Sequence, residues 1–508
     1  MTDPASAPLP DAADGPDRVR STTVADVEAV LHGGGAAGTV LPLLVTGQGA
    51  SPGVGSGPLA LSVDDALDAY DRGEDPVFIA EQTSPADEPA MRVAAAVVTA
   101  RGGLASHAAV VARGWGLPAV CGAESVVLRA GGISVGPEFV AVGDWLTVDG
   151  TSGEVRRGRV DGSGPVTELP DDLAVVLDAA DRCADGRPEV WANADTGDDA
   201  RLARRFGARG VGLCRTEHLF LGDRLPLLQE VLLHGGGDAL ADLERRQRAD
   251  LTDLLSAMDG LPVTVRLLDP PMHEFLPRAG DPGAGADLVA LANAWREENP
   301  MLGVRGVRLG LIRPDLYKLQ IRALVGAAVD LRDAGADPRP RLLVPMVSFV
   351  EEFVTVAGWV RGLAGPAGLS ELPLGAMVET PRAALRAGEL AGVADFLSFG
   401  TNDLTQLVLG FSRDDVESRL LPSYRDQGIV DVSPFQRLDA AVVDLMRRAA
   451  ADARSARPGI AVGVCGEQAG DEPSVAMIRD AGLSSVSCSP YRVPVARLAA
   501  GRAALGAG

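Results

Sequence analysis

The pattern of apolar positions changes twice along the first part of the chain. Residues 1–40 are rich in Pro, Ala, Gly and Asp, which predicts a mostly disordered N-terminal tail with a short helix over Thr23–Leu31. Over 41–155, short apolar runs are divided by glycine turns, which predicts a small domain of strands with one or two helices. Residues 156–188 are predicted to be a Gly-, Pro- and charge-rich linker that carries a helix over Asp171–Ala184.

A regular alternation of strand-like and helical segments fills residues 189–508. Eight apolar runs end in polar or charged residues and are separated by helical patterning; they are EVWANA, GVGLCRTE, VTVRLLD, VRGVRLG, RLLVPMV, LPLGAMVE, FLSFGTND and AVGVCGE. This order is typical of a (β/α)8 barrel, whose active site lies at the carboxyl ends of the strands. The predicted fold class is therefore α/β, with a C-terminal TIM-type barrel preceded by a small α/β domain.

Charge and cysteine usage exclude several classes of protein. The 508 residues carry 69 acidic and 47 basic side chains, a net charge of −22, which argues against a general binder of nucleic acid or of anionic membranes. The five cysteines are scattered without a CxxC pair, so neither a zinc ribbon nor a disulfide framework is expected. The sequence shows no apolar signal segment and no membrane-spanning run. We therefore expect a cytoplasmic protein.

The predicted strand ends bring arginines, carboxylates and one thiol to a single face. Arg215, Arg266 and Arg305 can each match two oxygens of a phosphate or carboxylate through the guanidinium fork. Glu379 and Asp403, together with phosphate oxygens, form a set of ligands that suits Mg²⁺. The barrel mouth is thus predicted to bind a small phosphorylated acid through Mg²⁺. The alternative is a set of structural ion pairs between barrel layers.

A second candidate site lies in the small domain, within residues 99–122. Gly102 and Gly103 predict a tight turn, and His107 falls in the first turn of the helix that follows. The free N–H groups of a helix N-terminus suit a phosphoryl group, and an imidazole there can attack phosphorus. His107 is therefore a candidate phosphoryl acceptor, although a single histidine is more often structural.

Several motifs together resemble those of one enzyme family. The segments that carry the resemblance include GGLASHAAVVARGWG, GLCRTEHLF, VRLLDPPMHEFLP, GAMVETPRA, SFGTNDLTQ, VCGEQAGD and VSCSPYRVP. They resemble the phosphoenolpyruvate-utilising enzymes and, in their wording, the dikinases that interconvert phosphoenolpyruvate and pyruvate. The resemblance covers roughly residues 44–505. It implies that the small domain is a swivelling phosphohistidine domain.

The resemblance assigns a role to each candidate residue. It implies that His107 accepts the phosphoryl group and that Cys465 protonates the enolate carbon of pyruvate. It makes Glu379 and Asp403 the ligands of a Mg²⁺ cofactor. The positions to which it gives a substrate-binding role are Arg215, Arg266, Arg305, Arg413, Gly400, Thr401, Asn402 and Asp403.

Two departures from the dikinase pattern bear on function. A full dikinase has an N-terminal ATP-grasp domain, and only about 40 residues precede the small domain here, so a separate ATP-grasp subunit is a possible partner for any ATP half-reaction. Ala105 stands where the family usually has a threonine, which in plant dikinases is the regulatory phosphorylation target.

The expected function is phosphoryl transfer between phosphoenolpyruvate or pyruvate and His107, in a homodimer by analogy with the relatives. Two alternatives stay open. One is a phosphoenolpyruvate–protein phosphotransferase of the enzyme I type, although 41–155 leaves no room for its carrier-binding insert. The other is a non-catalytic relic that senses phosphoenolpyruvate.

Overall fold

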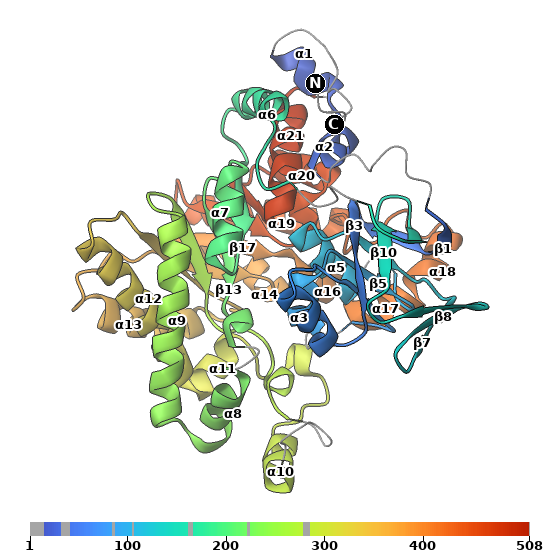
Figure 1. The fold of residues 1–508 in the computed structure, drawn as a ribbon. Coiled ribbons are helices and arrows are strands. Elements are labelled where there is room, and N and C mark those ends of the chain that lie inside the picture. The colour runs from blue at the N-terminus through green and yellow to red at the C-terminus, as the bar shows by residue number, and fades with distance from the viewer. Residues whose placement is uncertain are drawn as a thin grey trace.

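A closed barrel of parallel strands forms the larger part of the molecule, and a sheet domain lies beside it (Figure 1). The computed structural model describes residues 15–31, 41–83, 87–103, 106–160, 166–220, 224–277 and 285–506. The barrel strands follow one another in sequence order, and the last pairs with the first in parallel. The predicted α/β fold with a C-terminal TIM-type barrel is confirmed.

Eight short strands build the barrel wall. They are β12 (Glu189–Asn193), β13 (Val211–Arg215), β14 (Pro262–Arg266), β15 (Arg339–Val344), β16 (Leu374–Val378), β17 (Phe396–Gly400), β18 (Ala461–Cys465) and β19 (Ser485–Cys488). Their outward side chains are mostly Val, Leu and Ala and pack against a ring of helices in one continuous core.

The helices of the barrel half lie between and after these strands. They are α6 (Asp171–Ala184), α7 (Gly197–Arg205), α8 (Leu225–His234), α9 (Asp238–Ala257), α10 (Ala286–Ala294), α11 (Val307–Ile312), α12 (Pro314–Asp333), α13 (Val350–Ala364), α14 (Pro381–Leu385), α15 (Ala387–Ala391), α16 (Thr401–Leu409), α17 (Arg413–Arg419), α18 (Leu421–Asp426), α19 (Ala440–Ala456), α20 (Glu472–Asp480) and α21 (Val493–Ala504).

One predicted strand is wrong, and one strand of the barrel was missed. The run VRGVRLG, predicted as the fourth strand, contains the start of helix α11, because Gly306 turns the chain with φ +55° immediately before it. Its apolar residues Val307 and Leu309 are buried against the core from that helix instead. The missing strand is β19, which no apolar run indicated because its Ser485 and Ser487 line the barrel interior.

The N-terminal segment departs from the predicted tail. Residues 16–21 form α1 (Pro16–Ser21) and residues 24–31 form α2 (Val24–Leu31), whose buried side chains Val19, Val27 and Leu31 join the barrel core. Both helices pack against α21, and α1 also packs against α6 (Figure 1). The helix predicted over Thr23–Leu31 is confirmed as α2. Disorder is wrong for residues 15–22, because the helix they form finds a partner surface that composition cannot reveal. Residues 1–14 and 32–40 lie outside the described residues.

The helix predicted at the end of the linker is present as α6, and it belongs to the body of the barrel. It packs along α21, where the buried guanidinium of Arg497 bonds to Asp178 and Asp181. The chain therefore joins the barrel structure from Asp171 onward.

Truncating a buried N-terminal side chain tests this packing. We expect Leu31→Ala, which removes a fully buried side chain, to lower the free energy of unfolding by about 2–5 kcal/mol. Leu385→Ala is the control, because Leu385 on α14 is 46% exposed. Urea unfolding of both variants measures the difference, and equal stabilities would contradict the docked arrangement.

The small domain is an eight-stranded mixed sheet in the order β1-β11-β10-β3-β4-β5-β6-β2. The strands are β1 (Leu43–Thr46), β2 (Gln48–Ser51), β3 (Val54–Ala60), β4 (Val77–Ala80), β5 (Ala96–Thr99), β6 (Ala119–Cys121), β10 (Trp145–Asp149) and β11 (Glu154–Arg157). A separate meander joins β7 (Val126–Arg129), β8 (Gly132–Val135) and β9 (Glu138–Ala141). Helices α3 (Val63–Asp71), α4 (Glu88–Val93) and α5 (His107–Trp115) complete the domain.

Helix α5 of the small domain packs against the barrel. Ser106 caps its N-terminus by accepting a hydrogen bond from the Ala109 N–H, so the helix begins at His107. At its other end, Gly116 adopts φ +65°, and a Cβ there would lie 2.5 Å from the Tyr491 ring. Tyr491 follows β19 in a 3₁₀ turn, so α5 is docked beside the carboxyl end of that barrel strand. None of the helices in the described part is long and apolar enough to span a membrane.

Candidate active site

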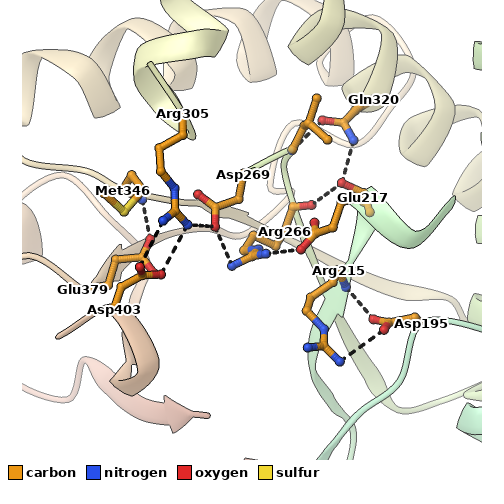
Figure 2. A network of polar contacts seen from close by, with 12 residues as sticks. Asp195, Arg215, Glu217, Arg266, Asp269, Arg305, Gln320, Met346, Glu379 and Asp403 are labelled. Atoms are coloured by element: carbon orange, nitrogen blue, oxygen red, sulfur yellow. Dashed lines mark hydrogen bonds and ion pairs between the residues drawn. The ribbon is translucent and has the colours of Figure 1, made fainter. Parts of the chain in front are cut away.

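A buried chain of ion pairs crosses the carboxyl face of the barrel (Figure 2). Arg266, the last residue of β14, pairs with Glu217 and, at 3.0 Å, with Asp269. Asp269 in turn accepts a hydrogen bond of 2.6 Å from Arg305. Arg305 then reaches Asp403 at the start of α16, with 3.0 Å between Nη1 and Oδ1. Side chains from four segments are thereby held in one layer across the barrel mouth.

These charges shift one another's ionisation. Burial opposes ionisation of the Asp269 carboxyl, but Arg305 and Arg266 outweigh it and lower its pKa. Burial likewise disfavours the charged form of Arg266, yet the neighbouring Glu217 and Asp269 raise its pKa above the usual arginine value. The central arginines and Asp269 therefore stay charged at neutral pH.

Arg305 is the charge that holds two carboxylates in place. It lies on the loop before α11 and contacts both Asp269 and Asp403 from a buried position. We expect Arg305→Met to destabilise the fold by about 3–5 kcal/mol, because two buried carboxylates lose their shared partner and Asp269 keeps, among the described residues, only its pair with Arg266. Arg308→Met is the control, because Arg308 on the same segment bonds only to the Leu302 and Gly303 carbonyls among the residues described. Urea unfolding that shows equal stabilities would contradict the central role of Arg305.

Two arginines of the network have N–H donors that no other described group accepts. The Nε atoms of Arg266 and Arg305 are buried and have no hydrogen-bond partner among the described residues. Unsatisfied buried donors are costly and rare. At a barrel mouth they are suited to the oxygens of an anionic ligand.

Arg215 lies beside this network at the end of β13. Its backbone N–H donates to Asp195 at 2.7 Å, and its guanidinium approaches the same carboxylate at 3.5 Å. Thr216, the next residue, donates through its hydroxyl to the carbonyl of Arg266 at 3.0 Å. This hydrogen bond links the carboxyl ends of β13 and β14, where Arg215 and Arg266 lie (Figure 2).

Glu379 and Asp403 lie together at the other end of the network (Figure 2). Glu379 follows β16, and one of its oxygens accepts a hydrogen bond from the Met346 N–H. Burial raises the pKa of Glu379 to about 8, with Asp269 and Asp403 adding to the shift. Burial also raises the pKa of Asp403, although Arg305 opposes it. The surrounding protein therefore compensates negative charge on these two carboxyls poorly, and Glu379 is mostly protonated at neutral pH when no cation is bound.

The donor set fits a divalent cation shared with a ligand. The site holds five carboxyl groups (Asp195, Glu217, Asp269, Glu379 and Asp403) against three guanidiniums, so ionisation of all five leaves an excess of two negative charges that a divalent cation balances. No cluster of three or more metal-ligating side chains occurs among the described residues. Two carboxylates completed by substrate oxygens and water are, however, a common Mg²⁺ arrangement.

Cys465 ends β18 and is 1% exposed. Its thiol accepts a hydrogen bond from the Ser398 hydroxyl at 3.6 Å and donates to the Phe399 carbonyl at 3.5 Å. Burial raises the pKa of the thiol to about 11. Cys465 is therefore a neutral thiol at physiological pH, able to donate a proton but not to act as a resting thiolate.

The segment Gly400–Asn402 packs closely against its neighbours. A Cβ on Gly400 would lie 2.5 Å from Glu379 Oε2. The Thr401 hydroxyl donates to Gln468 at 2.8 Å and is within 3.3 Å of the Cys465 carbonyl. Gly466 has φ +147°, and a Cβ there would collide with Thr401. Glycine at these two positions lets the ends of β17 and β18 approach.

The structure does not unite all the residues that the sequence indicated. Arg413 begins α17, where its guanidinium contacts Glu417 at 3.3 Å and lies over the Phe435 ring, and no contact joins it to the network among the described residues. The side chain of His107 and the whole of Ala105 lie outside the described residues, although the backbone of His107 begins α5. Their predicted roles therefore stay predictions.

Sequence reasoning missed three contributors to the site. Asp195 follows β12 in the segment NADT and could have been found as a polar residue after the first strand. Gln320 lies on α12, where its side chain donates to the Thr216 hydroxyl at 2.7 Å and accepts from the Leu268 N–H. Ser398 lies inside β17. No sequence signal marks the last two, because a helix glutamine and a strand serine have many structural uses.

Comparison with known proteins agrees with this geometry. The model described as "PEP-utilising enzyme, PEP-binding domain" matches residues 172–505, and "PEP-utilising enzyme, mobile domain" matches 73–153. Pyruvate, phosphate dikinase of Rhizobium meliloti is 42% identical over 486 residues, which cover 91% of this chain and 54% of the relative. The chloroplastic pyruvate, phosphate dikinase of Flaveria pringlei is 42% identical over 483 residues, 90% of this chain and 50% of the relative.

The chain spans about half the length of the curated relatives it matches. Among solved structures, an HpcH/HpaI aldolase/citrate lyase family protein from Burkholderia cenocepacia is 14% identical with a TM-score of 0.32, covering 61% of this chain and 92% of that chain, too low to support an inference. The two domain matches and the buried arginine–carboxylate network lead to one conclusion: this chain belongs to the PEP-utilising enzymes.

Proposed function

We propose that this chain transfers a phosphoryl group between phosphoenolpyruvate and His107, with pyruvate as the other product. The observation that carries the proposal is the pair of buried Nε donors of Arg266 and Arg305 at the barrel mouth, which find no acceptor in the part of the chain that the structure describes. They are donors for an anion, and they lie in the barrel domain that matches the PEP-binding family.

Substrate recognition in this proposal rests on the three arginines. Phosphoenolpyruvate carries a phosphate and a carboxylate, and guanidinium forks match both groups. Arg215 is half-buried and faces the mouth from β13, while Arg266 and Arg305 are buried behind it. Their present carboxylate partners hold them in position before substrate arrives, so little side-chain entropy is lost on binding.

Glu379 and Asp403 are the residues that would hold Mg²⁺. Their raised pKa values support the assignment, because negative charge on these two groups lacks a compensating cation in the protein alone. When bound, Mg²⁺ supplies positive charge to the phosphoryl oxygens and to the enolate oxygen as negative charge develops there.

We assign to Cys465 the role of proton donor to the enolate carbon. In the direction of phosphoenolpyruvate cleavage, the bond between phosphorus and the enol oxygen breaks and a bond to the His107 imidazole forms. The enolate electron pair then takes the thiol proton of Cys465 at its methylene carbon, which gives pyruvate and a thiolate. In the reverse direction the thiolate removes a methyl proton and the enolate oxygen attacks phosphohistidine. The raised thiol pKa supports Cys465 as the acid.

The other half of a dikinase reaction is assigned to a partner. In this proposal a separate ATP-grasp subunit exchanges the phosphoryl group of His107 with nucleotide. The pyruvate half-reaction requires no nucleotide, so it can be measured on this chain alone.

Isotope exchange tests the proposal. We expect the protein with Mg²⁺ to move ¹⁴C from pyruvate into phosphoenolpyruvate without any nucleotide, because exchange needs only reversible phosphorylation of the enzyme. Folded protein that binds phosphoenolpyruvate but gives no exchange would overturn the proposal in favour of a sensor. Exchange alone does not exclude an enzyme I type activity, so protein labelled from ³²P-phosphoenolpyruvate is also mixed with a small carrier protein. Passage of the label from the chain to the carrier would overturn the proposal in favour of that activity.

A further inference from the structure

A cavity lies at the opposite end of the barrel from the candidate active site. It encloses about 250 Å³ and is lined at its mouth by the first residues of three strands, Glu189, Ala461 and Ser485. It extends to Thr264 and Ser398 in the middle of β14 and β17. The cavity exceeds by far the roughly 15 Å³ that one water molecule requires.

Small residues on the barrel wall create this space. Gly212 faces Ser487, where a Cβ would come within 2.6 Å of the serine Oγ. Gly463 faces Ser485 in the same way, with 2.5 Å between the added Cβ and Oγ. A Cβ on Gly375 would collide with the Phe396 ring, which therefore lies against bare backbone. The interior is thus lined by hydroxyls and glycines where many barrels have branched aliphatic side chains.

Arg341 of β15 places a positively charged guanidinium in the wall of this cavity. Its guanidinium lies over the Phe396 ring at 3.7 Å and near the Trp191 ring at 5.2 Å. Within the described part of the chain, no oxygen accepts a hydrogen bond from its side chain, although a guanidinium has five N–H donors. Burial lowers its pKa to about 10, because the charge has lost water without gaining an ion pair.

The two carboxylates whose charge acts on Arg341 have other hydrogen-bond or ion-pair partners. Glu189 accepts a hydrogen bond from the Trp191 indole at 2.9 Å. Asp395 approaches Arg457 at 3.5 Å and accepts from the Leu374 N–H at 2.9 Å. Both act on Arg341 from a distance, and neither forms a salt bridge with it in the described residues. A partly buried guanidinium stacked on Phe396 therefore faces a polar cavity, and no described carboxylate pairs with it.

We propose that this cavity binds a small oxyanion, a carboxylate or a phosphate, on the guanidinium of Arg341. The aromatic rings fix the plane of the guanidinium, so its N–H edge can match two ligand oxygens at once. The hydroxyls of Thr264 and Ser485 supply further donors around the remaining oxygens. The site lies at the opposite end of the barrel from the proposed phosphoryl chemistry.

Trp191 gives a direct readout of occupancy, because it lines the cavity beside Arg341. Malonate and inorganic phosphate are titrated separately into the protein while tryptophan fluorescence is recorded, and Trp191→Phe assigns the signal among the five tryptophans. We expect a saturable change with at least one of the two anions. A response to malonate alone identifies a carboxylate site, and a response to phosphate alone identifies a phosphate site.

Arg341→Gln and Arg339→Gln form a matched pair on the same strand. Arg339 is exposed and paired with Asp337 at 2.7 Å, outside the cavity. We expect Arg341→Gln to weaken anion binding roughly tenfold or more, because a charged hydrogen-bonding partner is lost. Arg339→Gln is expected to bind as the wild type does.

A second variant, Ser485→Val, keeps the proposal testable if Arg341→Gln does not fold. Ser485→Val narrows the cavity and removes a hydroxyl while it keeps the charge of Arg341, and we expect it to weaken binding as well. The absence of saturable binding in the wild type would overturn the proposal. Binding that survives Arg341→Gln unchanged, or Ser485→Val unchanged where the former does not fold, would overturn it too.

Discussion

His107→Ala abolishes the acid-labile label that the wild-type chain acquires from ³²P-phosphoenolpyruvate. This is the largest effect we expect. The label requires a phosphorus–nitrogen bond, and the imidazole of residue 107 is the proposed nucleophile at the capped N-terminus of α5. Alanine keeps the helix but offers no nitrogen. Acid and base stability of the protein-bound label, measured with pyruvate release, provides the readout.

His234→Ala is the matched control for this loss. His234 ends α8 on the surface, where its ring lies 4.0 Å from Glu230. We expect this variant to label as the wild type does. Full labelling of the His107→Ala protein, or loss of label in His234→Ala alone, contradicts the assignment.

Cys465→Ala is expected to slow pyruvate formation by about 10²–10⁴-fold, the contribution of a positioned general acid. The thiol is 1% exposed, and burial raises its pKa to about 11, so the proton is present throughout the neutral range. Without it the enolate has no positioned donor. Deuterium incorporation at the pyruvate methyl group in heavy water, followed by NMR, measures the proton transfer itself.

A second buried cysteine separates chemistry from packing. Cys488 ends β19 and is 2% exposed, so Cys488→Ala removes a thiol of similar burial from a neighbouring strand. We expect that variant to retain deuterium exchange close to the wild-type rate. Equal losses in the two variants would show that the effect of Cys465→Ala is one of packing, and the acid assignment would fail.

The architecture was predictable because a parallel barrel repeats one sequence pattern many times. Seven of the eight predicted runs contain barrel strands, and the exception was ambiguous for a physical reason. A short apolar run such as VRGVRLG suits either a strand or one turn of a buried helix, and Gly306 with φ +55° decides for the helix. The strand β19 escaped because its serines line a polar cavity where aliphatic residues were expected.

The candidate site was predictable as a list of residues but not as a network. Strand ends placed Arg215, Arg266, Glu379 and Cys465 on one face, and the structure brings them there. The pairing of Arg305 with both Asp269 and Asp403 depends on a loop between α10 and α11. Such pairings between distant segments follow from tertiary geometry, which local patterns do not contain.

Locating the phosphoryl group tests the central claim most directly. Wild-type protein is incubated with phosphoenolpyruvate and Mg²⁺, digested at neutral to alkaline pH, and analysed by mass spectrometry alongside a pyruvate assay. We predict that phosphate lies on His107 in the peptide that contains α5, with an equal amount of pyruvate released. Phosphate on any other residue, or bound phosphoenolpyruvate with no transfer, would contradict the account.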